Sequence, residues 1–126
     1  MEKPLSLRVL PDRLAVCRLS PDAPVPEPPS RGFWSVTRTP DELSVVLPEA
    51  EARPEWKAER GWRGFMVAGP LDFSLTGILA SIASPLAVAG VSLFALSTYD
   101  TDYVLVREAD LERAAQALQE AGHAVA

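Results

Sequence analysis

Short runs in which apolar and polar residues alternate occupy the first half of the chain, and this period of two is typical of β-strands. The turn residues Thr39-Pro40-Asp41-Glu42 separate two of these runs and predict an antiparallel hairpin. Five prolines between positions 21 and 29 predict a stiff, extended connection, and the polar stretch 49–61 predicts a loop or a short helix around Trp56. The predicted strands cover residues 5–9, 14–19, 33–38, 43–47 and 62–67.

The second half begins with apolar residues at helical spacing and continues with two strands and a second helix. Ser74 or Thr76 is the expected N-cap of the first helix, Gly90 its expected C′ residue, and Pro85 is expected to kink it or to separate its last turn. The apolar face of this helix comprises Leu75, Ile78, Leu79, Ile82, Leu86 and Ala89. The elements that follow are predicted as strands at 91–96 and 103–106, a helix at 108–121 and a short strand at 123–125.

From residue 62 onward, this order of elements is βαββαβ. It predicts an α+β, ferredoxin-like fold, in which an antiparallel four-stranded sheet carries two helices on one face. Residues 1–61 contain strands and only weak helix signals, so we interpret them as a degenerate copy of residues 62–126. Two similar halves in tandem are therefore expected.

Composition and charge exclude several classes of function. The 126 residues have a net charge of −5, and the arginines are scattered, which argues against a nucleic-acid partner. Polar residues, Pro85 and Gly90 interrupt the apolar stretch 75–96, so we expect no membrane span, and the N-terminus lacks the apolar core of a signal peptide. Cys17, the single cysteine, is interpreted as a small core residue, which suits a cytoplasmic protein.

The sequence offers little for catalysis or for binding a metal. His123 is the single histidine and is interpreted as a capping or surface residue, so neither a nucleophile–histidine pair nor a zinc site is expected. Asp72, Asp100 and Asp102 are acid–base candidates by elimination alone. We therefore predict no enzyme activity, no cofactor and no metal site.

Two segments could together bind a zwitterion such as a free amino acid. Gly77, at the predicted helix start, lets a ligand approach backbone N–H groups that suit a carboxylate. Asp102 or Asp100 in the bend 97–102 could accept the ammonium group, with Tyr99 and Ile78 as apolar walls. The alternative is that Gly77 only permits close packing and that the bend is an ordinary polar hairpin tip.

The segment GPLDFSLTGILASIASPLAVAGVSLFALSTYDTDYVLV resembles the ACT domain, a ligand-binding module of amino-acid metabolism, and in particular the ACT-type domains of the CASTOR arginine sensors and their bacterial relatives. FWSVTRTPDELSVVLPE resembles the N-terminal part of those bacterial proteins. The resemblance implies two ACT-like folds, 1–61 and 62–126. It also implies that ACT domains pair side by side. The ligand-binding residues that it implies, together with their neighbours in the bend, are Leu75, Thr76, Gly77, Ile78, Thr98, Tyr99, Asp100, Thr101 and Asp102.

Leu75 departs from that pattern, because the arginine sensors carry an acidic residue at this position. A cationic side chain would lose its charge partner there, so a smaller or apolar amino acid fits better than arginine. The sequence thus predicts a cytoplasmic, homodimeric, regulatory amino-acid-binding protein without catalytic activity. The alternative is a ligand-free module for dimerisation or for docking to a metabolic enzyme.

Overall fold

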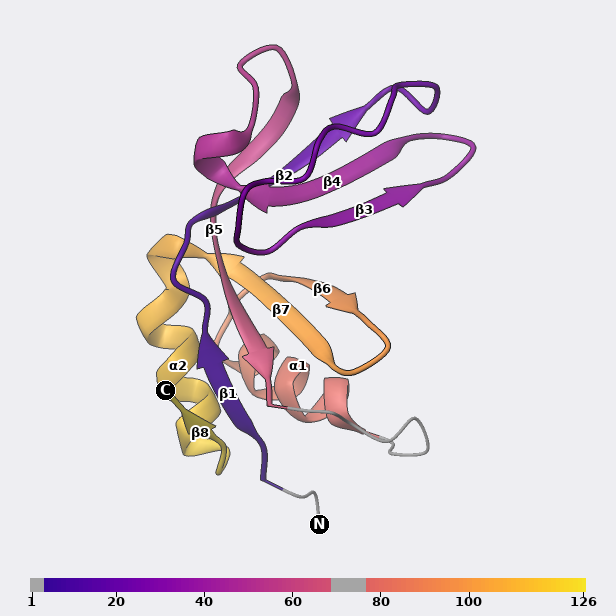
Figure 1. Cartoon of the computed structure of the whole chain (residues 1–126). Helices are drawn as coiled ribbons and strands as arrows, with labels where there is room; N and C mark the ends of the chain where they lie inside the picture. The colour runs from indigo at the N-terminus through magenta and orange to yellow at the C-terminus, as the bar shows by residue number, and fades with distance from the viewer. Residues whose placement is uncertain (1–3, 69–76) are drawn as a thin grey trace. The chain divides into compact units, whose positions relative to one another are not determined.

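A computed structural model describes residues 4–68 and 77–126, which form two compact units (Figure 1). Unit 1 comprises Met1–Pro11 and Arg63–Ala126, and unit 2 comprises Asp12–Trp62. The elements are β1 (Ser6–Val9), β2 (Leu14–Leu19), β3 (Ser35–Arg38), β4 (Leu43–Pro48), the short 3₁₀ helix η1 (Glu49–Glu51), β5 (Lys57–Val67), α1 (Ile78–Val88), β6 (Leu93–Ser97), β7 (Asp102–Arg107), the 3₁₀ turn η2 (Glu108–Asp110), α2 (Leu111–Glu120) and β8 (Ala124–Val125).

Unit 1 contains the predicted βαββαβ order, from the second part of β5 to β8, which confirms the ferredoxin-like prediction. Its strands follow one another in the order β6, β7, β5, β1 and β8. β1 is antiparallel to β5 and parallel to β8, so one pair of the sheet departs from the expected antiparallel arrangement. The reason is that β1, from the N-terminus of the chain, lies between β5 and β8 and adds a fifth strand.

The core of unit 1 lies between its sheet and its two helices. Alternate residues of the strands, among them Phe65 and Val104, have no exposed surface and pack against Ile82 of α1 and Leu118 of α2. Burying each such side chain contributes about 1.5–3 kcal/mol. The predicted face of the first helix is therefore confirmed at positions 82 and 86, whereas Leu79, predicted on the same face, is 37% exposed.

Both helices end in the same glycine-dependent motif. After α1, Gly90 has a φ of 74° and donates its N–H to Ala87 O, while Val91 N–H binds Leu86 O. After α2, Gly122 has a φ of 101°, and the N–H of His123 binds Leu118 O. These are Schellman motifs, in which glycine adopts the left-handed conformation without steric cost. The predicted C′ role of Gly90 is correct.

The start of α1 differs from the prediction, and its last turn is not separated at Pro85. A kink at Pro85 stays a prediction. The N-cap is Gly77, with a φ of 76°, and α1 begins at Ile78; Ser74 and Thr76, the predicted caps, lie outside the described residues. α1 continues through Pro85 to Val88 without a break. The carbonyl that Pro85 leaves without its helical donor has another partner, described below, which explains why the helix continues.

Unit 2 is a four-stranded antiparallel sheet in the order β3, β4, β2 and the first part of β5. The hairpin β3–β4 forms as predicted, and Thr39 N–H binds Glu42 O across its turn at 2.9 Å. Leu43, Val45 and Leu47 of β4 are buried with Ala15 and Cys17 of β2 and form the core of this unit.

The prediction for residues 49–61 was wrong over their second part, because residues 57–61 belong to β5. Most side chains there are polar and exposed, and only Ala58 packs against the core, so the alternation was too sparse to detect. The pairing is irregular, since Leu14 opposes Trp62 while Val16 opposes Glu59, and Gly61 in this bulge has a φ of 78°.

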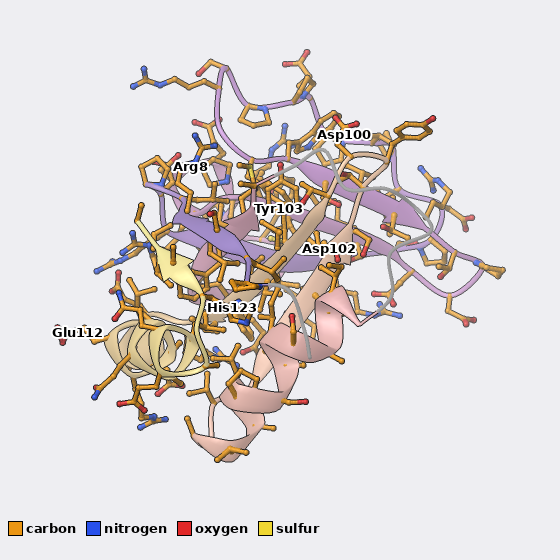
Figure 2. The ribbon with its side chains drawn as sticks, turned by 90° about the horizontal axis from the view of Figure 1, so that it is seen from below. Arg8, Asp100, Asp102, Tyr103, Glu112 and His123 are labelled. Carbon is orange, nitrogen blue, oxygen red and sulfur yellow. The ribbon has the colours of Figure 1, made fainter. Side chains whose placement is uncertain are left out.

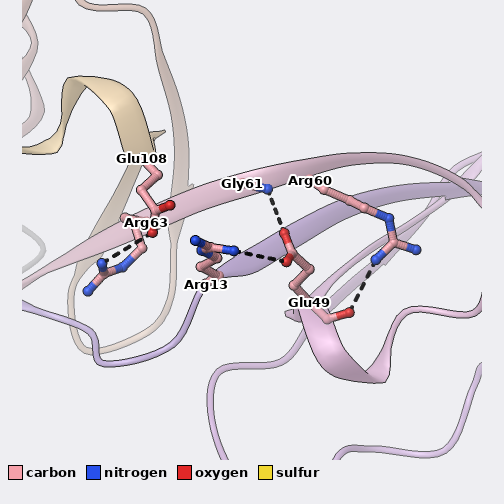
Figure 3. A network of polar contacts seen from close by, with 6 residues as sticks. All are labelled: Arg13, Glu49, Arg60, Gly61, Arg63 and Glu108. Carbon is pink, nitrogen blue, oxygen red and sulfur yellow. Dashed lines mark hydrogen bonds and ion pairs between the residues drawn. The ribbon is translucent and has the colours of Figure 1, made fainter.

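Glu49 stabilises the bulge (Figure 3). Its Oε1 accepts the N–H of Gly61 at 2.8 Å, and its Oε2 lies 3.8 Å from the guanidinium of Arg13. Arg60 donates to the backbone carbonyl of Glu49 at 3.3 Å. The carboxylate thereby satisfies an amide that the bulge has removed from the ladder.

Candidate functional site

Among residues 4–68 and 77–126, no side chain caps the backbone amides in the first turn of α1. Gly77 O accepts the first helical hydrogen bond, from Ser81 N–H at 2.9 Å, and Gly77 has no side chain that could bond to the N–H groups after it. These amides belong to Ile78, Leu79 and Ala80, of which the last two are exposed. Helix N-terminal amides and the helix dipole favour an anion at this position.

The hairpin of β6 and β7 supplies the acidic and hydroxyl groups. Ser97 pairs with Asp102, so the turn proper covers residues 98–101 and Asp102 begins β7. The Oγ of Ser97 donates to Asp102 Oδ1 at 2.6 Å, which fixes the orientation of the carboxylate and leaves Oδ2 as a further acceptor.

Two threonines of the turn are engaged in local hydrogen bonds. Thr98 N–H binds Thr101 O at 2.8 Å, and Thr98 Oγ1 accepts the N–H of Thr101 at 3.2 Å. Thr101 is 7% exposed and donates its hydroxyl to Val67 O, the last residue of β5, at 2.7 Å. Thr101 thus anchors the hairpin to the end of β5, where the chain leaves for α1.

The remaining candidates lie at different distances from α1. Figure 2 shows Asp102 beside the first turn of α1 and Asp100 farther out, at the end of the hairpin. Figure 1 likewise places the α1 start and the β6–β7 turn at the same end of unit 1. Tyr99 is 80% exposed and Asp100 is exposed. The structure therefore brings Gly77, Ile78 and Asp102 to one end of the unit; Leu75, Thr76 and Asp72 lie outside the described residues.

His123 is a buried structural residue, so of its two predicted roles the surface role was wrong. Its N–H binds Leu118 O at the end of α2, which agrees with the capping role. It is 7% exposed, Nδ1 lies 3.0 Å from the N–H of Leu5, and Nε2 lies 3.0 Å from Ser81 O. A backbone N–H can only donate and a carbonyl can only accept, so the ring is neutral and carries its proton on Nε2. Ser81 O is the carbonyl that the Pro85 ring leaves without an i+4 donor.

The other reactive side chains do not form a site. Within residues 4–68 and 77–126, no group of three His, Cys, Asp or Glu side chains could hold a metal ion. Cys17 is buried in the core of unit 2, and burial raises the pKa of its thiol, an effect that the charge of Arg60 partly opposes. Over the same residues, no helix is both long and apolar enough to cross a bilayer.

Comparison with known protein families agrees with this architecture. The sequence profile described as "ACT domain" matches residues 57–120, which include the whole of β5, both helices and the β6–β7 hairpin. The chain belongs to the ACT domain family. A second profile, which describes an N-terminal domain, matches residues 12–55, within unit 2.

Individual proteins resemble the chain in sequence and in structure. The chain is 32% identical over 103 residues to the human cytosolic arginine sensor for mTORC1 subunit 1; the match covers 75% of this chain and 31% of the sensor. The chain thus spans about a third of that relative's length. A structural-genomics protein from Agrobacterium tumefaciens is 37% identical, with a TM-score of 0.93 over 99% of this chain and 94% of that one. The regulatory subunit of aspartate kinase from Thermus thermophilus shares the fold at 12% identity, with a TM-score of 0.62 over 92% of this chain and 96% of that subunit.

One concave surface was not predicted from the sequence. It lies in unit 2 and involves the proline segment, Arg53 and Trp56. No motif marks it, because its walls come from segments about 30 residues apart that only the folded sheet brings together.

Proposed function

We propose that the chain is a non-catalytic regulatory module that binds a free amino acid at the N-terminal end of α1. The observation that carries the proposal is the juxtaposition, in a member of the ACT family, of uncapped helix amides and the oriented carboxylate of Asp102. The amides would donate hydrogen bonds to the α-carboxylate, with about 0.3–1 kcal/mol from the helix dipole in addition to the hydrogen bonds. Asp102 Oδ2 would accept the α-ammonium group.

The ligand proposed is a small or apolar amino acid. The similar human protein is named as an arginine sensor, but Leu75 offers no charge partner for a guanidinium. Ile78, half-buried at the helix start, would contact the ligand side chain. The names of the relatives also support a cytosolic protein with a regulatory role.

A titration of the full chain with each of the twenty amino acids tests this proposal. We expect calorimetric heat and a rise in Tm with at least one small or apolar amino acid at millimolar concentration, and none with arginine; a Kd of 1 mM corresponds to about −4.1 kcal/mol. Asp102→Asn keeps the shape of the side chain and should weaken binding about tenfold or more. Glu112→Gln, an exposed residue on α2, is the matched control and should leave binding unchanged.

Asp100→Asn decides between the two aspartates that the sequence left open. Asp100 is exposed at the hairpin end, so the substitution should change affinity less than Asp102→Asn. The absence of any response across the twenty amino acids would contradict the proposal and favour the ligand-free interaction module.

We also propose that the protein forms a homodimer through α1 and β6. No charged residue occurs from Ile78 to Tyr99, Val88 is 90% exposed, and β6 pairs with β7 alone among the described strands. An uncharged helix face beside an open strand edge suits a second copy of the same surface. Sedimentation velocity should show a dimer that Val88→Lys converts to a folded monomer, since the exposed position tolerates a charge; a monomeric wild type would refute this assignment.

A further inference from the structure

Unit 2 contains a groove of about 550 Å³ that the amino-acid proposal does not use. Its lining includes Leu19 at the end of β2, the proline segment with Val25 and Glu27, and Arg53 and Trp56 from the segment before β5. Leu19 and Trp56 also pack against the core of the unit, so part of the lining of the groove is apolar. The volume falls within the range of small-ligand pockets.

The proline wall is held in place by Arg38 of β3. Its guanidinium donates to Pro21 O and, at 2.7 Å, to Ala23 O. Ala23 N–H binds Ser20 O at 3.0 Å, which closes the turn that follows β2. Together with the fixed φ of Pro24 and Pro26, these contacts keep Val25, 49% exposed, on the wall of a pre-formed groove.

Another part of the lining presents an oriented cation. The backbone N–H of Trp56 binds Arg53 O at 3.1 Å and closes a turn. In this turn the Arg53 guanidinium lies 5.6 Å from the centre of the Trp56 ring. A guanidinium that stacks on a ring keeps its N–H groups at the edge available for a carboxylate. Arg53 forms no ion pair in the contacts found among the described residues.

The charges and the size of the groove define its ligand. Arg53 suits a carboxylate, and Glu27, which also lines the groove, suits an ammonium group. The volume of about 550 Å³ is larger than a single amino acid occupies. We propose that the groove binds a short peptide of two or three residues through its free carboxylate, its free ammonium group and an apolar side chain.

The test uses the full chain and one dipeptide, phenylalanyl-leucine, in four forms: free, N-acetylated, C-amidated and blocked at both ends. Binding is followed by the NMR resonance of the Trp56 indole N–H, which Trp56→Phe identifies. The free dipeptide should shift this resonance and bind about threefold to fivefold more tightly than either singly blocked form, as expected for exposed ion pairs. No shift at 10 mM, or equal affinity for the doubly blocked form, would overturn the proposal.

Substitutions assign each charge to its partner. Arg53→Gln should reduce the affinity for the free dipeptide to that of the C-amidated form and leave the affinity for the C-amidated form unchanged. Glu27→Gln should reduce the affinity for the free dipeptide to that of the N-acetylated form and leave the affinity for the N-acetylated form unchanged. Arg31→Gln, an exposed arginine of unit 2 that does not line the groove, is the control and should change neither. Loss of affinity for all four forms in Arg53→Gln would contradict the assignment of the carboxylate to Arg53.

This groove and the α1 site lie in different units, so the NMR resonances of different residues follow binding at each. A free amino acid bound at α1 should shift the amides of Ile78 and Asp102 and leave the Trp56 indole in place, whereas the dipeptide should do the reverse. Either proposal can therefore fail without the other.

Discussion

Replacing His123 tests whether its ring compensates for the proline inside α1. In the wild type the ring joins three parts of unit 1: Leu5 before β1, Ser81 in α1 and the end of α2. His123→Ala leaves a buried donor on Leu5 and a buried acceptor on Ser81, and each such group costs about 1–3 kcal/mol. With the small cavity added, the free energy of unfolding should fall by about 3–5 kcal/mol.

A double-mutant cycle with Pro85→Ala isolates the contribution of the Ser81 carbonyl. Alanine at position 85 supplies the helical N–H that proline lacks, so Ser81 O acquires a second donor. In that background His123→Ala should cost about 1 kcal/mol less than in the wild type, while the cost at Leu5 remains. Urea unfolding of the four variants, followed by circular dichroism, measures the coupling.

Two local measurements separate this mechanism from a general loss of packing. In the wild type, ¹⁵N NMR of the ring should show the neutral tautomer with its proton on Nε2. The amide of Leu5 should exchange its hydrogen slowly in the wild type and in Pro85→Ala, and rapidly in both His123→Ala variants. Additive free energies within about 0.3 kcal/mol would refute the proposed link between His123 and Pro85.

Three further predictions concern other polar groups of the fold. Glu49→Gln should lower the free energy of unfolding by about 1 kcal/mol and Glu49→Ala by more, because Gly61 N–H then lacks an acceptor; equal stability in urea would contradict this. Thr101→Val should cost about 1–2 kcal/mol and speed amide exchange in the hairpin, since Val67 O loses its buried donor. Burial raises the pKa of the Cys17 thiol above its value in the unfolded chain, so the stability of the wild type relative to Cys17→Ala should be constant below pH 9.0 and decrease as the pH rises further; parallel pH profiles would exclude this.

Most elements were predictable from the sequence because the information for them is local. The period of two in Leu14–Leu19 and the period of 3.6 around Ile82 and Leu86 follow directly from which faces are buried. Gly90 and Gly122 mark helix ends because few other residues adopt a positive φ. The ACT fold could therefore be predicted from patterns and motifs alone.

The errors arose where a non-local partner decides the structure. Pro85 is tolerated because His123, 38 positions later, supplies a partner for Ser81 O. No sequence pattern links these two positions. The same distance hid the role of β1, whose strand neighbours are β5 and β8. Whether residues 1–61 are a degenerate copy of residues 62–126 stays a prediction.

The candidate site could be predicted in kind but not in detail. Composition and motif indicated hydroxyls and acids in a bend after the helix, but not which of them the fold itself uses. Thr101 is committed to Val67 O and Thr98 to the turn, so their hydroxyls already have protein partners. A ligand at this end of unit 1 would therefore rely on Asp102 and on backbone amides, which any α-amino acid can engage. Selectivity among amino acids would then come from the residues that contact the ligand side chain, and Ile78 is the described residue for which we propose that role.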